Sequence, residues 1–104
     1  MANYALAYTG GSTSEDEAER KAVMDAWGTW FGSIGDGVVD AGNPFGASTS
    51  ISADGAVRDG APSKLSGYSI ISADSLASAS DVAKRCPVLQ GGGNVEVYEI
   101  VPVM

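Results

Sequence analysis

Asp40 is the residue of this chain whose setting best suits acid–base chemistry. It follows Val38 and Val39 and precedes Ala41, so an apolar environment is expected to raise the pKa of its carboxyl, as a general base requires. Tyr68 is the candidate hydrogen-bond donor that would act beside it. The alternative interpretation is that Asp40 lies on an edge strand and faces water.

Histidine is absent from the chain, and this excludes several common catalytic and metal sites. Activation of serine or cysteine by an imidazole is impossible, and one cysteine cannot complete a zinc site of the Cys/His type. Cys86 has no adjacent base, so we expect a buried structural thiol. Asp54 and Asp59 precede glycines, as is typical of turns, and their spacing does not fit a calcium loop. We therefore expect no metal and no cofactor.

Aromatic side chains supply the candidate ligand-binding residues. All four tyrosines lie in segments that we predict to be strands, where most of them are expected to pack. Trp27 lies on the apolar stripe of a predicted helix; packing is the more common role there, and an indole can also line a ligand cavity. The residues that we expect to contribute to a ligand cavity are Tyr8, Trp27, Asp40, Tyr68 and Tyr98.

Strands with a side-chain period of two must position these residues. The pattern predicts strands over 3–8, 38–41, 66–73 and 95–101. Asp54 and Gly55 predict a two-residue hairpin turn between strands over 48–53 and 56–58.

Two helices are predicted between the strands. The first is expected over 15–34, with Ser14 as its cap and Glu17 completing a capping box. The second is expected to run from a cap at Asp74 or Ser75 to about Arg85. Each carries an apolar stripe about 100–120° wide, as expected for a helix packed on a core. The stripe of the first helix consists of Val23, Trp27, Trp30, Phe31 and Ile34.

The order of these elements predicts an α+β fold. It is the ferredoxin-like split βαβ pattern with an antiparallel sheet, two helices on one face and an inserted β-hairpin. A chain of 104 residues is long enough for one domain, which we place over 1–104. The sheet face without helices carries rings and aliphatic side chains, and the simplest cover for it is a second copy in a two-fold homodimer.

The charge of the chain excludes some partners. The net charge is −7 and the six basic residues are scattered, which argues against binding to nucleic acid and to an anionic membrane surface. An apolar run of about 20 residues, which could span a bilayer, is absent from the sequence. The first residues do not read as a signal peptide, so a cytoplasmic location is expected.

Four stretches follow one another along nearly the whole chain: AWGTW (26–30), VDAGNPFG (39–46), GYSIISADSL (67–76) and CPVLQGGGNVEV (86–97). Together they resemble the YCII-related domain family. The resemblance implies a ferredoxin-like α+β fold that dimerises through its sheets as a dimeric α/β-barrel. Some members are thought to use a His-Asp pair in lyase-like chemistry on aromatic compounds, which a chain without histidine cannot do. Another branch has an Asp-Gly-Pro-Phe motif, whereas residues 59–62 read DGAP here.

Three hypotheses for the function remain. The leading one is a homodimer that binds a small organic molecule, such as an aromatic compound, in a cavity between its two sheets. The second is a lyase or isomerase that uses Asp40 as general base and Tyr68 as hydrogen-bond donor. The third is a structural or accessory module without a ligand. Convergence of Asp40 and a tyrosine hydroxyl on one pocket favours the enzyme, and Asp40 facing bulk water excludes it.

Overall fold

The predicted alternation of strands and helices is present in the computed structural model, which describes residues 1–11 and 16–103. The fold is α+β, with two α-helices and strands that all pair antiparallel. The elements in chain order are β1 (Ala2–Thr9), α1 (Glu17–Ile34), the 3₁₀ turn η1 (Gly35–Gly37), β2 (Val38–Asp40), β3 (Thr49–Ile51), β4 (Val57–Asp59), β5 (Leu65–Ala73), α2 (Leu76–Ala83), the 3₁₀ turn η2 (Pro87–Leu89) and β6 (Asn94–Ile100).

Four of the strands form the main sheet, in the order β2-β5-β1-β6. The unit β1-α1-β2 is split by β5, and the unit β5-α2-β6 is split by β1. This topology is compatible with the expected ferredoxin-like arrangement. The central pair is in register with Leu6 opposite Ser69, and Leu6 also lies opposite Val97 of β6.

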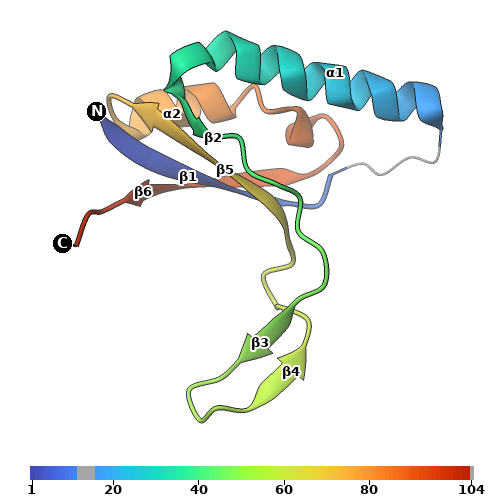
Figure 1. The fold of residues 1–104 in the computed structure, drawn as a ribbon, viewed down its shortest axis with the longest axis vertical. Helices are drawn as coiled ribbons and strands as arrows, with labels where there is room; N and C mark the ends of the chain where they lie inside the picture. The colour runs from blue at the N-terminus through green and yellow to red at the C-terminus, as the bar shows by residue number, and fades with distance from the viewer. Residues whose placement is uncertain (12–15, 104) are drawn as a thin grey trace.

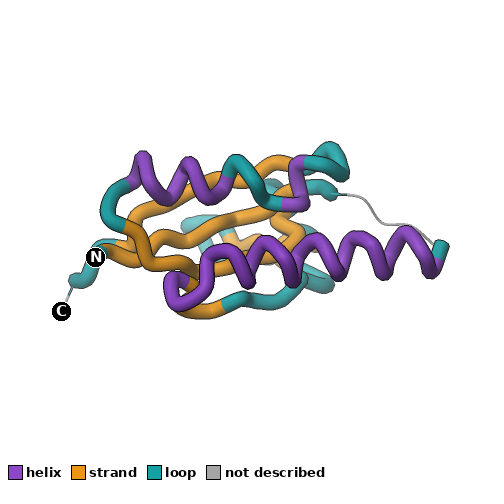
Figure 2. The backbone as a smooth tube through the Cα atoms, turned by 90° about the horizontal axis from the view of Figure 1, so that it is seen from above, coloured by secondary structure: helices purple, strands orange, loops and turns teal. Residues whose placement is uncertain are grey.

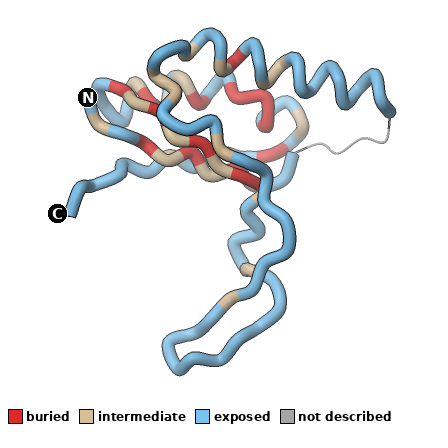
Figure 3. Tube along the Cα trace, viewed as in Figure 1, coloured by how far each residue is buried: buried red, intermediate tan, exposed pale blue. Residues whose placement is uncertain are grey.

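Both helices cover the same face of this sheet (Figure 1). Seen from above, α1 and α2 lie along the two sides of the sheet (Figure 2). The indole Nε1 of Trp30 in α1 donates to the carbonyl of Val82 in α2 at 3.1 Å, which ties the two helices together. The buried residues concentrate between helices and sheet (Figure 3), and include Tyr4, Leu6 and Ile71. As predicted, the period of two along β1 and β5 selects the buried side chains.

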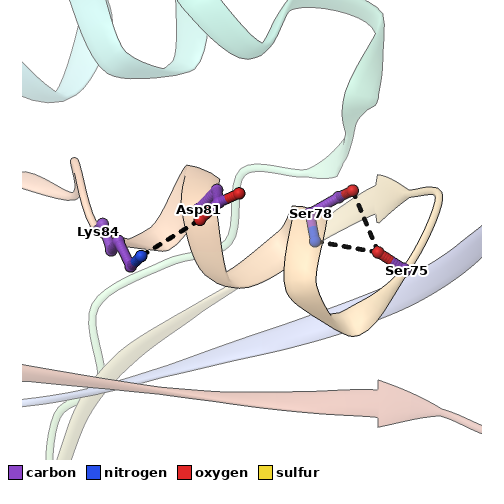
Figure 4. A network of polar contacts seen from close by, with 4 residues as sticks. All are labelled: Ser75, Ser78, Asp81 and Lys84. Atoms are coloured by element: carbon purple, nitrogen blue, oxygen red, sulfur yellow. Dashed lines mark hydrogen bonds and ion pairs between the residues drawn. The ribbon is translucent and has the colours of Figure 1, made fainter.

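One end of each helix differs from its predicted position by two residues, whereas α1 ends at Ile34 as predicted. Helix α1 begins at Glu17, and the Asp16 carboxylate caps it by accepting from the backbone N–H of Ala18 at 2.8 Å. The predicted cap, Ser14, lies outside the described residues. The cap of α2 is Ser75, one of the two predicted candidates, and its Oγ accepts from the backbone N–H of Ser78 (Figure 4).

The end of α2 lies at Ala83, before the predicted Arg85. The backbone N–H groups of Arg85 and Cys86 donate three residues back rather than four, to the carbonyls of Val82 and Ala83. The helix therefore tightens into a turn before Pro87, which cannot continue the hydrogen-bond ladder.

The first half of α1 extends past the ends of the strands (Figures 1 and 2). Trp30 is buried and Trp27, Phe31 and Ile34 are half-buried against the core, so this part of the predicted stripe is confirmed. Val23, two turns earlier, is exposed because the core does not extend beneath it. All residues from Glu17 to Asp25 are exposed.

The inserted hairpin is present, but its turn is longer than predicted. Ile51 pairs with Val57, and Ser52 and Ala56 close the loop through a backbone hydrogen bond of 3.0 Å. Three residues lie between them instead of two, and Gly55 has a φ of 88°. The Asp54 carboxylate accepts from Ser52 Oγ and from the Ala56 backbone, and these hydrogen bonds lower the pKa of Asp54. The predicted turn role of Asp54 is thus confirmed.

The hairpin projects from the side of the sheet that the helices leave uncovered (Figure 1). We call this side the open face. Central β1 presents small side chains there, while both neighbouring strands present large ones: Ala7 lies between Tyr68 and Glu96, and Ala5 lies between Ile70 and Tyr98. Tyr98 and Ile100 are exposed, whereas Tyr68 and Ile70 are half-buried. The open face therefore carries the exposed aromatic and aliphatic side chains that we predicted.

Candidate binding cavity beneath α1

A cavity of about 780 Å³ lies beneath the overhanging half of α1. The helix forms one wall, and Tyr8 of β1 and Ser69 of β5 lie on the sheet side. The segments 41–44 and 87–91 and the two glycines after β1 complete the boundary. The volume is within the range of pockets that bind small organic ligands.

Aromatic rings form the most apolar part of this cavity. The ring of Trp27 meets that of Tyr8 edge to face, with centroids 5.1 Å apart and an angle of 75°. The ring of Phe31 lies 5.8 Å from that of Trp27. The rings of Tyr8, Trp27 and Phe31 thus form one contiguous group that borders the cavity, with the geometry that aromatic pairs favour.

The sheet side of the cavity contains a short chain of hydrogen bonds. The Tyr8 hydroxyl donates to Ser69 Oγ at 2.7 Å, and the Ser69 hydroxyl donates to the Ala41 carbonyl at 2.7 Å. Burial raises the pKa of Tyr8, so its hydroxyl stays protonated as a donor. Both hydroxyl protons are engaged, and neither side chain has the adjacent base that a nucleophile needs among the described residues. The pair therefore orders the cavity and does not supply a nucleophile.

Cys86 is next to Tyr8 in the core, and 1% of its surface is exposed. Burial raises the pKa of its thiol, so the reactive thiolate is disfavoured. The predicted role of Cys86 as a buried structural thiol is confirmed.

A glycine allows the segment 41–44 to approach β5 closely enough to bound the cavity. A Cβ atom on Gly42 would lie 1.7 Å from the carbonyl oxygen of Tyr68. The backbone φ angle of Gly42 is 81°, in the left-handed region. Any larger residue would clash with the strand and would also strain the backbone. The Gly42 N–H donates to Asp40 Oδ1 at 2.8 Å, which fixes the start of this segment.

Asp40 and Tyr68 meet, but on the open face. The Tyr68 hydroxyl donates to Asp40 Oδ2 at 3.1 Å, and the Tyr68 ring stacks on Phe45 with centroids 5.6 Å apart. The hydrogen bond to the carboxylate raises the pKa of Tyr68. Asp40 is exposed, because β2 is an edge strand and a register shift places Asp40 opposite Ile70. The expected desolvation of Asp40 is therefore wrong, and the interpretation as a water-facing edge residue is confirmed.

This geometry does not suit a general base. Both carboxylate oxygens of Asp40 already accept a hydrogen bond, one from the Gly42 backbone and one from Tyr68. The second predicted hypothesis, a lyase or isomerase based on Asp40, loses the burial on which it depended.

The five predicted site residues do not form one site. Tyr8 and Trp27 border the cavity beneath α1. Tyr68 is part of the cavity lining and also lies on the open face, where it contacts Asp40. Asp40 and Tyr98 lie on the open face, where the Tyr98 hydroxyl donates to Glu96 Oε1 at 3.0 Å and this bond raises the pKa of Tyr98. Because side chains alternate along a strand, residues from both faces were combined in the prediction.

The cavity beneath α1 was not expected from the sequence, and the predicted cavity between two sheets, which needs a second chain, stays a prediction. We expected the space between two sheets, whereas the cavity of the single chain lies on the helix side. Phe31 was identified on the apolar stripe but assigned only to the core. The segments at 41–44 and 87–91 contain glycine and proline and were not expected to contribute to a cavity, although their paths bound it.

The described residues contain no group of three or more His, Cys, Asp or Glu side chains arranged to hold a metal ion. Neither helix of the described chain is long and apolar enough to cross a membrane. No protein-family model, curated protein or solved structure matches this chain. The resemblance to YCII-related domains therefore stays a prediction, and the proposals below depend on the geometry of the chain itself.

Proposed function

We propose that this chain binds a small, ring-bearing organic molecule in the cavity beneath α1. The observation that carries the proposal is the volume of about 780 Å³ next to the contiguous rings of Tyr8, Trp27 and Phe31. Binding pockets typically combine such an apolar wall with a few polar groups. Here Asn43 and Gln90 lie on the boundary and are candidates for orienting the polar end of a ligand.

Blocking the cavity from α1 tests this proposal. Ala26 is half-buried in the lining, so Ala26→Phe places a ring in the space that the ligand would occupy. Ala18 lies on the same helix, is exposed and is not part of the lining, so Ala18→Phe is the matched control. Calorimetric titration with a neutral probe, 4-phenylbutanol, is expected to show binding to wild type and to the control, and none to Ala26→Phe.

Circular dichroism and the urea midpoint establish that each variant is folded. If Ala26→Phe does not fold, Ala22→Phe blocks the cavity from its exposed rim instead. Equal binding by wild type and a folded blocking variant contradicts the proposed location. Absence of binding by wild type at millimolar probe contradicts binding of this ligand class.

We propose further that two chains associate through their open faces, as a ferredoxin-like homodimer of the α/β-barrel type. The support is the exposure of Tyr98 and Ile100 on a face without helices, and the hairpin that extends from the same side. A second copy would cover these apolar side chains. This arrangement leaves the cavity beneath α1 on the outer side of each sheet.

Sedimentation velocity over a range of concentrations tests the association. Tyr98 is 55% exposed, so Tyr98→Glu places a charge on the open face with little effect on the core. Leu76 of α2 is 52% exposed on the helix side, and Leu76→Glu is the matched control. We expect dimers for wild type and the control, and monomers for Tyr98→Glu. A monomeric wild-type chain at 100 μM, or a variant that dimerises equally well, contradicts the proposal.

A further inference from the structure

We propose that the cavity beneath α1 selects ring-bearing molecules with a positive charge, and that the Glu19 carboxylate is their counter-charge. This inference rests on the proposed binding function and names the chemical class of the ligand. The first support is the charge of the lining: among the described lining residues Glu19 is the one carboxylate, and none is Lys or Arg. The two tyrosines in the lining, Tyr8 and Tyr68, have raised pKa values and remain neutral.

The second support is the aromatic group at the other end of the cavity. The faces of aromatic rings carry partial negative charge and attract cations within about 6 Å of the ring centre. Trp27 provides the strongest such surface among protein side chains, and Tyr8 stands at a steep angle to it. The faces of these rings attract a neutral ring or an organic ammonium group more strongly than a carboxylate.

Helix geometry sets the length of the ligand. Glu19, Val23 and Trp27 follow at intervals of four residues, so they share one side of α1 and all border the cavity. Eight residues of α-helix rise by about 12 Å between Glu19 and Trp27. A molecule with a ring at one end and an ammonium group several bonds away can therefore contact Trp27 and approach Glu19 together.

The net charge of the chain and two of its ion pairs act in the same direction. The net charge of −7 raises the concentration of cations near the surface. On α1, the ammonium group of Lys21 pairs with Asp25 at 2.9 Å, and Lys84 of α2 pairs with Asp81 at 3.3 Å. These cations lie next to carboxylates outside the cavity lining, so they do not provide a site for an anionic ligand.

Three probes of similar shape measure the charge preference: 4-phenylbutylamine, 4-phenylbutanol and 4-phenylbutyrate. We expect the amine to bind about three- to tenfold more tightly than the alcohol, and the carboxylate to bind most weakly. The advantage of the amine is expected to shrink in 0.5 M salt, because Glu19 is exposed and its field is screened.

Glu19→Gln is expected to reduce the affinity for the amine to that for the alcohol, with the alcohol unaffected. Glu17→Gln is the matched control, because Glu17 also lies in the first turn of α1, carries the same charge and is outside the lining. Tighter binding of 4-phenylbutyrate, or an equal loss of amine affinity in both variants, overturns the inference. Equal binding of all three probes overturns charge selection while supporting the proposed function, and absence of binding by all three overturns both.

Discussion

The hydrogen bond between Tyr8 and Ser69 permits a quantitative test of the packing beneath the cavity. Both residues are at least 95% buried, and the 2.7 Å bond between them is extended by the bond from Ser69 to the Ala41 carbonyl. The described residues contain no buried side-chain nitrogen or oxygen without a partner. Removing one hydroxyl therefore creates a defect that the wild-type chain does not have.

The two single substitutions differ in what they leave behind. Tyr8→Phe removes one neutral hydrogen bond and leaves Ser69 bonded to Ala41, for an expected loss of about 1 kcal/mol. Ser69→Ala removes both hydrogen bonds of the Ser69 hydroxyl, for an expected loss of about 2 kcal/mol. The double variant also loses only these two bonds, because the Tyr8–Ser69 bond is removed in both single variants, so its loss is expected near 2 kcal/mol rather than the sum of about 3 kcal/mol.

Urea unfolding followed by tryptophan fluorescence measures this coupling of about 1 kcal/mol. At an m-value near 1 kcal/mol/M it corresponds to a displacement of the midpoint by about 1 M from the additive expectation. The m-values must agree among the four proteins for the comparison to hold. Additive losses within about 0.3 kcal/mol would refute the reasoning, because the two hydroxyls would then act independently.

Three further predictions concern the rest of the chain. At a pH between the ordinary Tyr pKa of about 10 and the raised pKa of folded Tyr8, this side chain loses its proton only in the unfolded chain. The unfolding free energy of wild type is therefore expected to fall with pH more steeply than that of Tyr8→Phe, by up to about 1.4 kcal/mol per pH unit. Urea unfolding from pH 9 to 11 measures both slopes, and equal slopes contradict this prediction. Gly28→Ala in α1 is expected to stabilise the folded chain by about 0.5–1 kcal/mol, because a Cβ at this helical position meets no atom within 4 Å. Gly42→Ala is expected to prevent folding or to lower the melting temperature by more than about 10 °C, because its Cβ would overlap the Tyr68 carbonyl oxygen. Tyr68→Phe removes an exposed hydrogen bond and is expected to change the unfolding free energy by less than about 0.5 kcal/mol; a larger loss would show that Asp40 and Tyr68 are buried in the assembled protein.

The strands were predictable because their burial follows a local pattern. Tyr4, Leu6 and Tyr8 alternate with small residues in the sequence and alternate in burial in the structure. The helix stripe predicted Trp30 as a core residue for the same reason. These predictions need only the period of each element and no knowledge of its neighbours.

The candidate site was less predictable, because it depends on where the elements end and which of them lie at an edge. Apolar neighbours in the sequence suggested burial for Asp40, but β2 has only one neighbour in the sheet and the register shift exposes the carboxylate. Val23 continues the apolar stripe of α1 past the core, so it borders a cavity instead of packing. Neither fact can be read from periodicity, since both follow from the relative placement of helix, strand and loop.

The hairpin β3–β4 also has a practical consequence for experiments. Its loop over 52–56 is fully exposed, and its strands pair with each other and with no strand of the four-stranded sheet in the described chain. The backbone can therefore be divided at this loop without cutting any element of the main sheet. The two resulting fragments, one with β1, α1 and β2 and the other with β5, α2 and β6, each supply half of the sheet, which makes the chain suited to fragment complementation.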